Sequence, residues 1–600
     1  MTDRIVKIAG ATAFFEDSFY GHPAMMRAGI DYIVYDYLAE VTMSILAADT
    51  SSPGYHVNFL EDIRPYLGEL LDRGIRIVTN WGGLDPQAAA QALQGLAGEL
   101  GRNPKIAVVT GDDLRGRVDE LRAMGVREMF SAAPLPDDRE ILSINAYFGG
   151  FPIAAALAMG ADIVITGRVV DSALSLGPLI HEFGWEVQDY DRLAAGTLIG
   201  HLLECSTQAT GGISTDWMDV PNPEDIGNPI CECRADGSFV LTKPEGTGGL
   251  VTPGSVMEQM IYEVSDPQAY YAPDVVADFS EARFVQEAEN RVLVTGVRGY
   301  PPTGSYKVCA TFNTGWRGQV YQPIIGIGAA HKARRQAQAL FDRTNNILRM
   351  RNLKPLNLAH AEVLGAESSY GPRSRMGDAR EVVAMLTVDH DEPEGVRIFL
   401  KEQICAISAM AQGTAMNLGG LMGRGVVPLM QVFNFLLDKD AATPVVTAWW
   451  RSGGYVVDNR SGFSAAMLVR PSEPSEPADI APGLTVPLVK LAWARSGDKG
   501  NLFNAGVFSR EPRFYPYIAA ALSADAVAQW FAHLVDDPGA ARADRYLLPG
   551  CLGLNFVVHD SLGGGASVCA RVDPLAKAMG QILLDYPVPV SHAIGEELSC

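Results

Sequence analysis

The sequence predicts an α/β protein with a large doubly wound, mostly parallel domain, an α+β lobe within it, and a small C-terminal α/β sandwich. Over the first 200 residues, short and continuously apolar runs alternate with helical patterns, which is typical of strands buried on both faces by helices. A segment rich in Pro, Ser and Glu precedes the last part of the chain, where the pattern of strands and helices changes. With 600 residues, 48% of them hydrophobic, the chain can bury such cores without disulfides or metal ions.

The parallel sheet is expected from apolar, β-rich runs that are too short to be helices. Helices are expected between these runs, where apolar residues recur at helical spacing. The expected strands are Ile5–Ala9, Tyr32–Tyr35, Ile75–Asn80, Ile106–Thr110 and Ile163–Thr166. The expected helices include Glu61–Arg73, Pro86–Leu100 and Leu114–Ala123.

The pattern becomes irregular and rich in glycine around residues 201–255, and then turns into mixed α and β. We expect this second part to pack as an α+β lobe of one large domain that covers residues 5–465. Its expected strands are Arg291–Val297, Tyr306–Phe312, Gln319–Gly326 and Val382–Val388, with a helix at His331–Leu348 and another from about Ile398.

Residues 471–486, with the sequence PSEPSEPADIAPGLTV, are expected to be a linker, because proline favours extended chain and blocks helices. Residues 487–590 then form the predicted small domain. Its expected strands are Val486–Ala492, Leu552–Val558 and Ser567–Ala570, and its expected helices are Ala524–Leu534 and Pro574–Leu584.

The formal charge of −22 counts against a nucleic-acid-binding face, which needs concentrated Lys and Arg. Eight cysteines without a CxxC pair or zinc-type spacing are expected to be free thiols in a reducing compartment. The N-terminal residues carry Asp and Glu too early for a signal peptide. No uncharged stretch is a continuous apolar span of about 20 residues, as a bilayer requires. We therefore expect a cytoplasmic protein that binds no nucleic acid or membrane, and a homo-oligomer.

Polar residues directly follow the five expected strands. In open α/β sheets the ligand crevice lies beyond the carboxyl ends of the strands. We therefore expect one pocket at this edge. The side chains expected to converge there are Asp36, Asn80, Asp112, Arg168 and Asp171.

Arg168 and Asp171 lie where a buried strand enters a helix, in the sequence GRVVDS. Arg168 is a candidate clamp for a carboxylate or phosphate, and Asp171 is a candidate base. The alternative is that Asp171 caps the helix or pairs with Arg168. Asn80, in NWGG, is a candidate donor to a carbonyl or oxyanion, or else a turn residue.

His201, Glu204 and Cys205 share a helical face in HLLECSTQATGG. Such a cluster can transfer protons, because a carboxylate raises the basicity of an imidazole, and a thiol can act as a nucleophile. A buried His with satisfied hydrogen bonds and an inert Cys are the alternative. Gly211 and Gly212 follow, and glycine lets backbone N–H groups approach a ligand.

Carboxylates at the same edge make Mg²⁺ a possible ligand, since Mg²⁺ takes oxygen ligands. The alternative is that these carboxylates cap helices or are surface charges. These carboxylates are Asp36, Glu40, Asp112 and Asp113.

A glycine loop, EGTGGLVTPGS, contains Thr247 and Gly248 and is a candidate cradle for a thioester carbonyl or a pyrophosphate. The loop lacks the Lys-Ser/Thr pair of a P-loop and the full dinucleotide spacing, so it is also compatible with a plain turn.

The segment ARSGDKGN in the small domain places two cations, a carboxylate and an amide between glycines: Arg495, Asp498, Lys499 and Asn501. We expect this polar turn to bind coenzyme A phosphates or to face the crevice of the large domain. A network of ion pairs between domains is the alternative.

Several segments resemble the acyclic terpene utilisation family of AtuA-like proteins. The larger domain of that family is similar in GATAFFEDS, TGRVVDSALSLGPLIHEFGW, HLLECSTQATGG, KPEGTGGLVTPGSVMEQMIYEV and GYPPTGSYKV. The segment LAWARSGDKGNLFNAGVFSR resembles the C-terminal domain of the family, which implies a ferredoxin-like fold there. The resemblance also implies a role in bacterial catabolism of acyclic terpenes and related branched acyl-CoA compounds, and it carries no catalytic motif residue by residue.

Two functions remain open from the sequence. The first is a catabolic enzyme acting on a branched or terpenoid acyl-CoA, either a hydratase or a C–C lyase, with the coenzyme A thioester as substrate and no certain cofactor. His201, Glu204, Asp171 and Cys205 would do the chemistry, and the glycine loops would stabilise an enolate oxygen. The second is a non-catalytic component that binds acyl-CoA or assembles with other proteins of the pathway.

Overall fold

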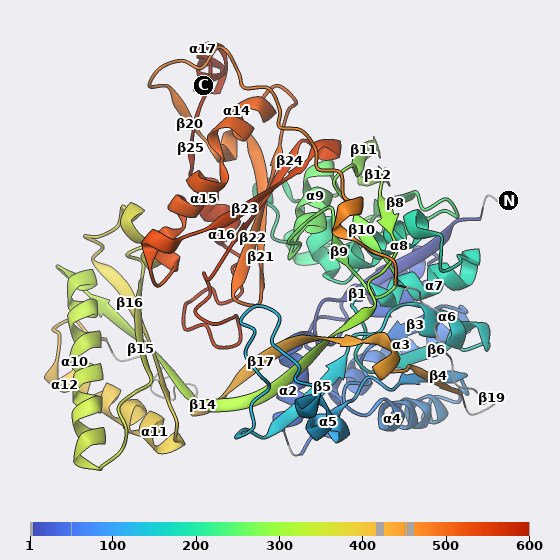
Figure 1. The fold of residues 1–600 in the computed structure, drawn as a ribbon, viewed down its shortest axis with the longest axis horizontal. Coiled ribbons are helices and arrows are strands. Elements are labelled where there is room, and N and C mark those ends of the chain that lie inside the picture. Colours follow the sequence, from blue (N-terminus) through green and yellow to red (C-terminus); the bar gives the residue numbers. More distant parts are fainter. Residues whose placement is uncertain (1–3, 50, 416–424, 449–450, 453–460, 599–600) are drawn as a thin grey trace.

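The structure is a computed structural model that describes residues 4–49, 51–415, 425–448, 451–452 and 461–598 (Figure 1). Among these residues the largest sheet has eleven strands in the order β11-β12-β8-β7-β1-β2-β3-β6-β4-β18-β19. Its strands are β1 (Val6–Thr12), β2 (Tyr32–Tyr35), β3 (Arg76–Thr79), β4 (Ile106–Thr110), β6 (Ile163–Thr166), β7 (Ile230–Cys233), β8 (Phe239–Thr242), β11 (Arg283–Ala288), β12 (Arg291–Thr295), β18 (Val445–Ala448) and β19 (Arg451–Ser452).

The centre of this sheet is parallel, because β1, β2, β3, β6 and β4 pair in parallel with their neighbours. Alternate residues of these strands enter two different cores. Ile8 and Val34 pack on one face, while Ile33 and Ile165 pack on the other. Both faces are thus covered, which explains why the five strands are continuously apolar.

The sheet as a whole is mixed, and the expectation of a mostly parallel sheet is wrong outside its centre. The strands β7, β8, β12 and β11 extend it on one side through antiparallel pairs, and β18 and β19 do so on the other. The expected strand Arg291–Val297 is β12, so it belongs to this sheet and not to the lobe. The fold is therefore mixed α/β with several sheets.

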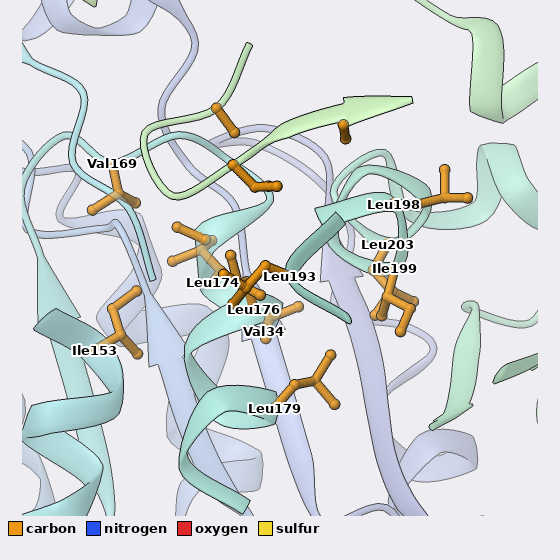
Figure 2. Packing of buried hydrophobic residues seen from close by; sticks show 14 of the residues in the cluster. Val34, Ile153, Val169, Leu174, Leu176, Leu179, Leu193, Leu198, Ile199 and Leu203 are labelled. Carbon is orange, nitrogen blue, oxygen red and sulfur yellow. The ribbon is translucent and has the colours of Figure 1, made fainter. Parts of the chain in front are cut away.

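Helices cover the two faces of the sheet. Figure 2 shows Leu174, Leu176 and Leu179 packed close to Val34, with Leu193 beside them. On this face lie α6 (Phe151–Ala158), α7 (Ala173–Phe183), α8 (Tyr190–Leu203) and α9 (Pro253–Ile261). On the other face lie α1 (His22–Arg27), α3 (Asn58–Asp72) and α4 (Pro86–Glu99). The chain also forms α2 (Glu40–Ala48), α5 (Val118–Ala123), and the short strands β9 (Tyr270–Tyr271), β10 (Val276–Asp278) and β13 (Arg298–Tyr300).

The α+β lobe stands apart from the large sheet at the left of Figure 1 and has its own core. A single long strand, β14 (Ser305–Ile325), replaces the two strands expected at 306–312 and 319–326. It pairs with β5 and β17 near the body of the protein and with β16 in the lobe. The other elements are β5 (Ile141–Ala146), α10 (Ala329–Met350), β15 (Leu358–Leu364), β16 (Glu381–His390), α11 (Pro393–Glu402), α12 (Ala406–Ala409) and β17 (Val427–Asp438).

The C-terminal part has an antiparallel sheet in the order β21-β22-β24-β23 and a separate core. The strand expected at Val486–Ala492 lies elsewhere: β20 ends at Pro487 and β21 begins at Ala492. The strand expected at Ser567–Ala570 is absent from this described region, because residues 567–570 form turns and irregular chain. The elements are β20 (Thr485–Pro487), β21 (Ala492–Lys499), β22 (Leu502–Ser509), α14 (Tyr515–Ala521), α15 (Ala524–Trp530), β23 (Ala543–Leu548), β24 (Gly553–Val558), α16 (Met579–Leu583), β25 (Pro587–Pro589) and α17 (His592–Leu598).

Two further expectations concern the chain as a whole. None of the helices in the described ranges combines the length and apolar character that crossing a bilayer requires. All seven cysteines in the described part are free thiols, as the sparse spacing predicts.

Candidate functional site

The polar side chains after β2 and β3 are joined by hydrogen bonds. Asn80 Nδ2 donates to Asp36 Oδ1 at 2.7 Å, and Asn80 Oδ1 accepts from the backbone N–H of Tyr37 at 2.7 Å. Both polar atoms of the Asn80 side chain therefore make hydrogen bonds within the protein. Its expected role as a donor to a ligand stays a prediction, which the second N–H of Nδ2 would serve.

Arg168 follows β6 and is almost completely buried. Its Nη1 donates to Asp171 Oδ1 at 2.7 Å and to the backbone carbonyl of Leu38, and its guanidinium lies 4.2 Å from the centre of the Tyr147 ring. The backbone N–H of Arg168 donates to Asp112 Oδ2 at 2.8 Å. The structure thus brings the five expected edge residues into one network, and Arg168 pairs with Asp171, the alternative considered above. The roles of these residues toward a ligand stay predictions.

Burial dominates the electrostatics of this edge. It raises the pKa of Asp112 to about 6, although the backbone of Arg168 and the side chain of Asn145 donate hydrogen bonds to the carboxylate. Burial also raises the pKa of Asp36, and the nearby Asp171 carboxylate acts in the same direction. Both carboxyls are costly to ionise where they lie.

No three His, Cys, Asp or Glu side chains in the described part of the chain lie so as to hold a metal ion. Asp36 and Asp112 are engaged by Asn80, Asn145 and backbone N–H groups, and Asp113 accepts from Arg115. The side chain of Glu40, the remaining carboxylate of the expected Mg²⁺ site, lies outside the described residues. The expected Mg²⁺ site therefore stays a prediction.

The end of α8 carries the expected acid–base pair. His201 Nδ1 lies 3.0 Å from Glu204 Oε1, and His201 Nε2 lies 3.0 Å from the backbone carbonyl of Met260. Burial lowers the pKa of His201, but the Glu204 carboxylate outweighs it, so the pKa is raised. Burial raises the pKa of Glu204, and Asp171 and Glu263 add to this. The Oε2 atom of Glu204 is buried and has no hydrogen-bond partner among the described residues.

Cys205 is a poor nucleophile in this environment. Burial raises the pKa of its thiol well above the ordinary value, and the carboxylates of Glu204 and Glu263 raise it further. Since the thiolate is the reactive form, the expected role of Cys205 as a nucleophile is disfavoured.

The segment ARSGDKGN is not a turn after a strand: residues up to Lys499 form β21, and only Gly500 and Asn501 turn toward β22. Lys499 Nζ donates to Glu263 Oε2 of the large domain at 2.7 Å. Arg495 is buried and donates to the Gln208 side chain and to the carbonyl of Ile213. The segment therefore faces the large domain.

Asn501 has a different surrounding. Its Oδ1 accepts from the backbone N–H of Gly564 at 2.8 Å and from that of Leu562 at 3.3 Å, and its Nδ2 donates to Asp560. These contacts all lie within the C-terminal domain. Asn501 thus orders the loop at 560–564. Asp498, on β21, also takes part in a polar or electrostatic interaction.

In the glycine loops that were expected to hold a ligand, the backbone N–H groups are occupied by carbonyl groups of the protein. The N–H groups of Gly211 and Gly212 both point to the carbonyl of Thr207. Those of Gly248 and Gly249 donate to the carbonyls of Asp225 and Pro221. Thr247 donates to the carbonyl of Pro244 at 2.7 Å. Because these donors are occupied, the expected backbone cradle at 211–212 and 248 is wrong in this conformation.

Gly211 and Gly212 do line a surface hollow of about 360 Å³. The hollow also includes the side chains of Ile213, Trp217 and Met218, which are more than half exposed. None of the titratable side chains described above lines it. One of its lining residues, Ile213, accepts a hydrogen bond from Arg495 through its carbonyl.

Four residues near the network were not expected from the sequence: Tyr262, Glu263, Tyr270 and Lys577. Tyr270 packs against the ring of His201, with ring centres 5.5 Å apart. Its hydroxyl interacts electrostatically with Glu204, Asp171, Glu263 and Lys499. Tyr270 therefore lies where the sheet edge, the end of α8 and strand β21 meet. No spacing along the chain signals these residues, since the partners that they contact lie far from them in sequence.

Comparison with known proteins agrees with this architecture. Residues 486–589 match the AtuA ferredoxin-like domain. No curated protein matches the chain, and no solved structure matches it. Residues 6–448, more than half of the 600, match the acyclic terpene utilisation family protein AtuA, and the chain therefore belongs to this family.

Proposed function

We propose that the protein is a bacterial catabolic enzyme that acts on a branched or terpenoid acyl-CoA, as a hydratase or a C–C lyase. Membership of its family implies involvement in acyclic terpene utilisation. The observation that carries the finer proposal is the state of Glu204. One of its carboxyl oxygens is held by His201, and the other is buried and has no hydrogen-bond partner in the described part of the chain.

The hydrogen bonds of His201 imply that one proton lies between His201 Nδ1 and Glu204 Oε1, in addition to the hydrogen on His201 Nε2. The carbonyl of Met260 can only accept, so His201 Nε2 must carry hydrogen. The 3.0 Å contact at Nδ1 then needs one more proton, placed either on His201 Nδ1 or on Glu204 Oε1. His201 thus positions Glu204 through Oε1, and Glu204 Oε2 is the atom that takes up a further proton when the carboxyl acts as an acid toward a substrate.

This arrangement suits proton transfer next to a thioester carbonyl. Hydration and C–C cleavage both need one group that gives a proton to carbon and another that takes one. Glu204 has a raised pKa, which suits the donor, and Asp171 is a second carboxylate in electrostatic contact with it. Asp171 is about one-third exposed, so a substrate can reach it from solvent.

The test is turnover of a panel of saturated, unsaturated and 3-hydroxy branched acyl-CoAs, followed by chromatography and mass spectrometry. We expect Glu204→Gln to lower kcat by about 10²- to 10⁴-fold, the usual range for a general acid or base. Glu224→Gln, at an exposed carboxylate, is the matched control. Turnover by Glu204→Gln at the wild-type rate would refute the role of Glu204.

Non-catalytic acyl-CoA binding is the second candidate, and the apolar hollow at Gly211 and Gly212 favours it. Exposed Trp217 and Met218 offer an apolar surface away from the acid–base pair. Calorimetry with coenzyme A and acyl-CoAs separates the two functions. Binding without turnover of any panel member supports a binding component, and Trp217→Ala should then weaken it.

A further inference from the structure

Glu263 is a second carboxylate at the boundary between the large domain and the C-terminal domain. It follows α9, and its side chain is about one-quarter exposed. Its backbone is left-handed, with a φ of 60°. A non-glycine residue in this conformation costs of order 1–3 kcal/mol, and such residues cluster at functional sites.

The C-terminal domain comes into close contact with Glu263 at Gly497 of β21. A Cβ added at Gly497 would lie 2.7 Å from Glu263 Cγ and 2.6 Å from the ring of Tyr262. Only glycine permits this approach. This close approach positions Lys499, two residues after Gly497. The Nζ of Lys499 donates to Glu263 Oε2 at 2.7 Å.

Tyr262, next to Glu263, is held by two more cations of the C-terminal domain. Lys577 Nζ donates to the Tyr262 hydroxyl and lies 4.4 Å from the centre of its ring. The guanidinium of Arg495 lies 4.6 Å from the same centre. The Tyr262 hydroxyl in turn acts on the Glu263 carboxylate and lowers its pKa. Lys577, Tyr262, Glu263 and Lys499 therefore form one charged chain across the boundary, with charge-assisted hydrogen bonds at its two ends.

Glu263 also belongs to the electrostatic surroundings of the His201–Glu204 pair. Burial acts to raise the pKa of Glu263, but Lys499 and the Tyr262 hydroxyl outweigh it, so the pKa is lowered. Glu204 and Glu263 thus have pKa values shifted in opposite directions, the pattern of an acid and a base that share a site. The titratable groups that interact with Glu263 are His201, Glu204, Cys205, Tyr262, Tyr270, Lys499 and Lys577.

We propose that the C-terminal domain completes the reaction centre, with Glu263 as the catalytic base, Lys499, Tyr262 and Lys577 as its positioning residues, and Glu204 as the acid. This inference rests on the proposed function. In the direction of hydration, Glu263 takes a proton from water as the water oxygen bonds to the β-carbon, and the C=C electron pair moves into the thioester enolate. Glu204, which in its acid form carries a further proton on Oε2 in addition to the one shared with His201, then gives that proton to the α-carbon. Water has been added, and the two carboxyls recover their starting states when Glu263 releases a proton to solvent and Glu204 takes one up.

The first experiment is the pH profile of kcat/KM on an acyl-CoA that the wild-type protein turns over. The ionisation of the base sets the acid limb of such a profile. Lys499→Met removes a cation from Glu263, so its acid limb should move to higher pH, and Lys499→Arg should restore it. Glu263→Gln should lose at least 10²-fold in kcat. Lys490→Met, at an exposed lysine of the same domain, is the control. A lower kcat with an unmoved limb in Lys499→Met overturns the proposal, since it indicates a merely structural role.

The second experiment needs no substrate. The rate at which iodoacetamide alkylates Cys205, followed by peptide mass spectrometry, reports the thiolate fraction. Glu263 raises and Lys577 lowers the pKa of this thiol. Glu263→Gln should therefore speed alkylation and Lys577→Met should slow it, by up to about tenfold for a shift of one pKa unit. Unchanged rates in both variants overturn the proposal. Changed rates without turnover of any acyl-CoA overturn the proposed function and the catalytic role of Glu263, but keep the charged chain across the boundary.

Discussion

Asn80 joins the ends of two neighbouring parallel strands, since its Nδ2 donates to Asp36 Oδ1 at 2.7 Å while its Oδ1 accepts from the N–H of Tyr37. All three groups are buried. The amide of Asn80 donates to a carboxylate and accepts from a backbone N–H at once, which an ionised aspartate in its place cannot do.

We therefore expect Asn80→Asp to lower the free energy of unfolding by about 2–4 kcal/mol, because it places a second carboxylate against Asp36 in a buried site. Urea unfolding at pH 7 measures the change. The same substitution at exposed Asn103 should change stability by less than about 0.5 kcal/mol. Equal effects at both positions would show that the contact with Asp36 does not stabilise the fold.

His22 predicts a loss of stability in mild acid. It is buried between aromatic rings, with Phe19 stacked on it at 4.3 Å, and Tyr35 Oη lies 2.7 Å from its Nε2. Burial lowers its pKa to about 4 from the ordinary 6.5. Between these values the unfolded chain binds a proton that the folded protein does not. The contribution of His22 is therefore complete above pH 6.5 and falls as the pH drops toward 4, by about 3 kcal/mol.

Asp112 and Asp274, whose pKa values burial raises to about 6, contribute a slope of the opposite sign. The measurement is thus the difference in unfolding free energy between the wild type and His22→Gln, from urea titrations at several values of pH from 4 to 7. This difference should shrink as the pH falls. A difference that is constant with pH, or one that His331→Gln reproduces, would contradict the assignment to His22.

We expect proteolytic cleavage of the linker to leave the two domains bound to each other. Residues 470–484 are largely without regular structure and mostly exposed, so limited proteolysis should cleave there and leave a C-terminal fragment of about 100 residues with its own core. The fragments should remain together on gel filtration. Asp216 of the large domain accepts from Arg510 Nη2 at 2.6 Å and from Trp493 Nε1 at 2.5 Å in the C-terminal domain.

Asp216→Ala should release the cleaved fragments from each other, or weaken their association by at least tenfold, because it leaves a partly buried guanidinium and an indole N–H without partners. Asp219→Ala, at a neighbouring carboxylate, should not. Cleavage spread through 500–580 would instead show that the domain boundary lies elsewhere.

Local patterns in the sequence predicted the parts of the fold that depend on neighbouring residues. The five central strands lie within three residues of their expected bounds, because an apolar run of this length is itself the signal. The strands β7 and β8 were missed inside a glycine-rich region, and the pairing of β18 with β4 joins residues more than 330 positions apart. Hydrophobic periodicity does not indicate which distant strands pair, so the sequence could not predict the mixed character of the sheet.

The contacts of the candidate site likewise fall into those that local spacing predicted and those that depend on the tertiary structure. Helical spacing predicted the contact of His201 with Glu204. Arg168 and Asp171 are three residues apart, and their ion pair was one of the expected alternatives. The contacts of Glu263 with Lys499 and of Tyr262 with Lys577 depend on how two domains dock. Nothing in the sequence indicates the left-handed backbone of Glu263 or its partner.

Strand β14 gives the molecule a mechanical property. It is 21 residues long, and it carries the lobe at one end while Lys307, near the other end, lies 4.9 Å from the Tyr147 ring that covers Arg168. At the middle of the strand, Arg317 pairs with Asp389 of the lobe and donates to the carbonyls of Val568 and Cys569 in the C-terminal domain. One continuous backbone therefore joins the lobe to the residues around Arg168, and Arg317 ties the middle of that backbone to the C-terminal domain. We expect a displacement of the lobe to be felt at Arg168 through this strand.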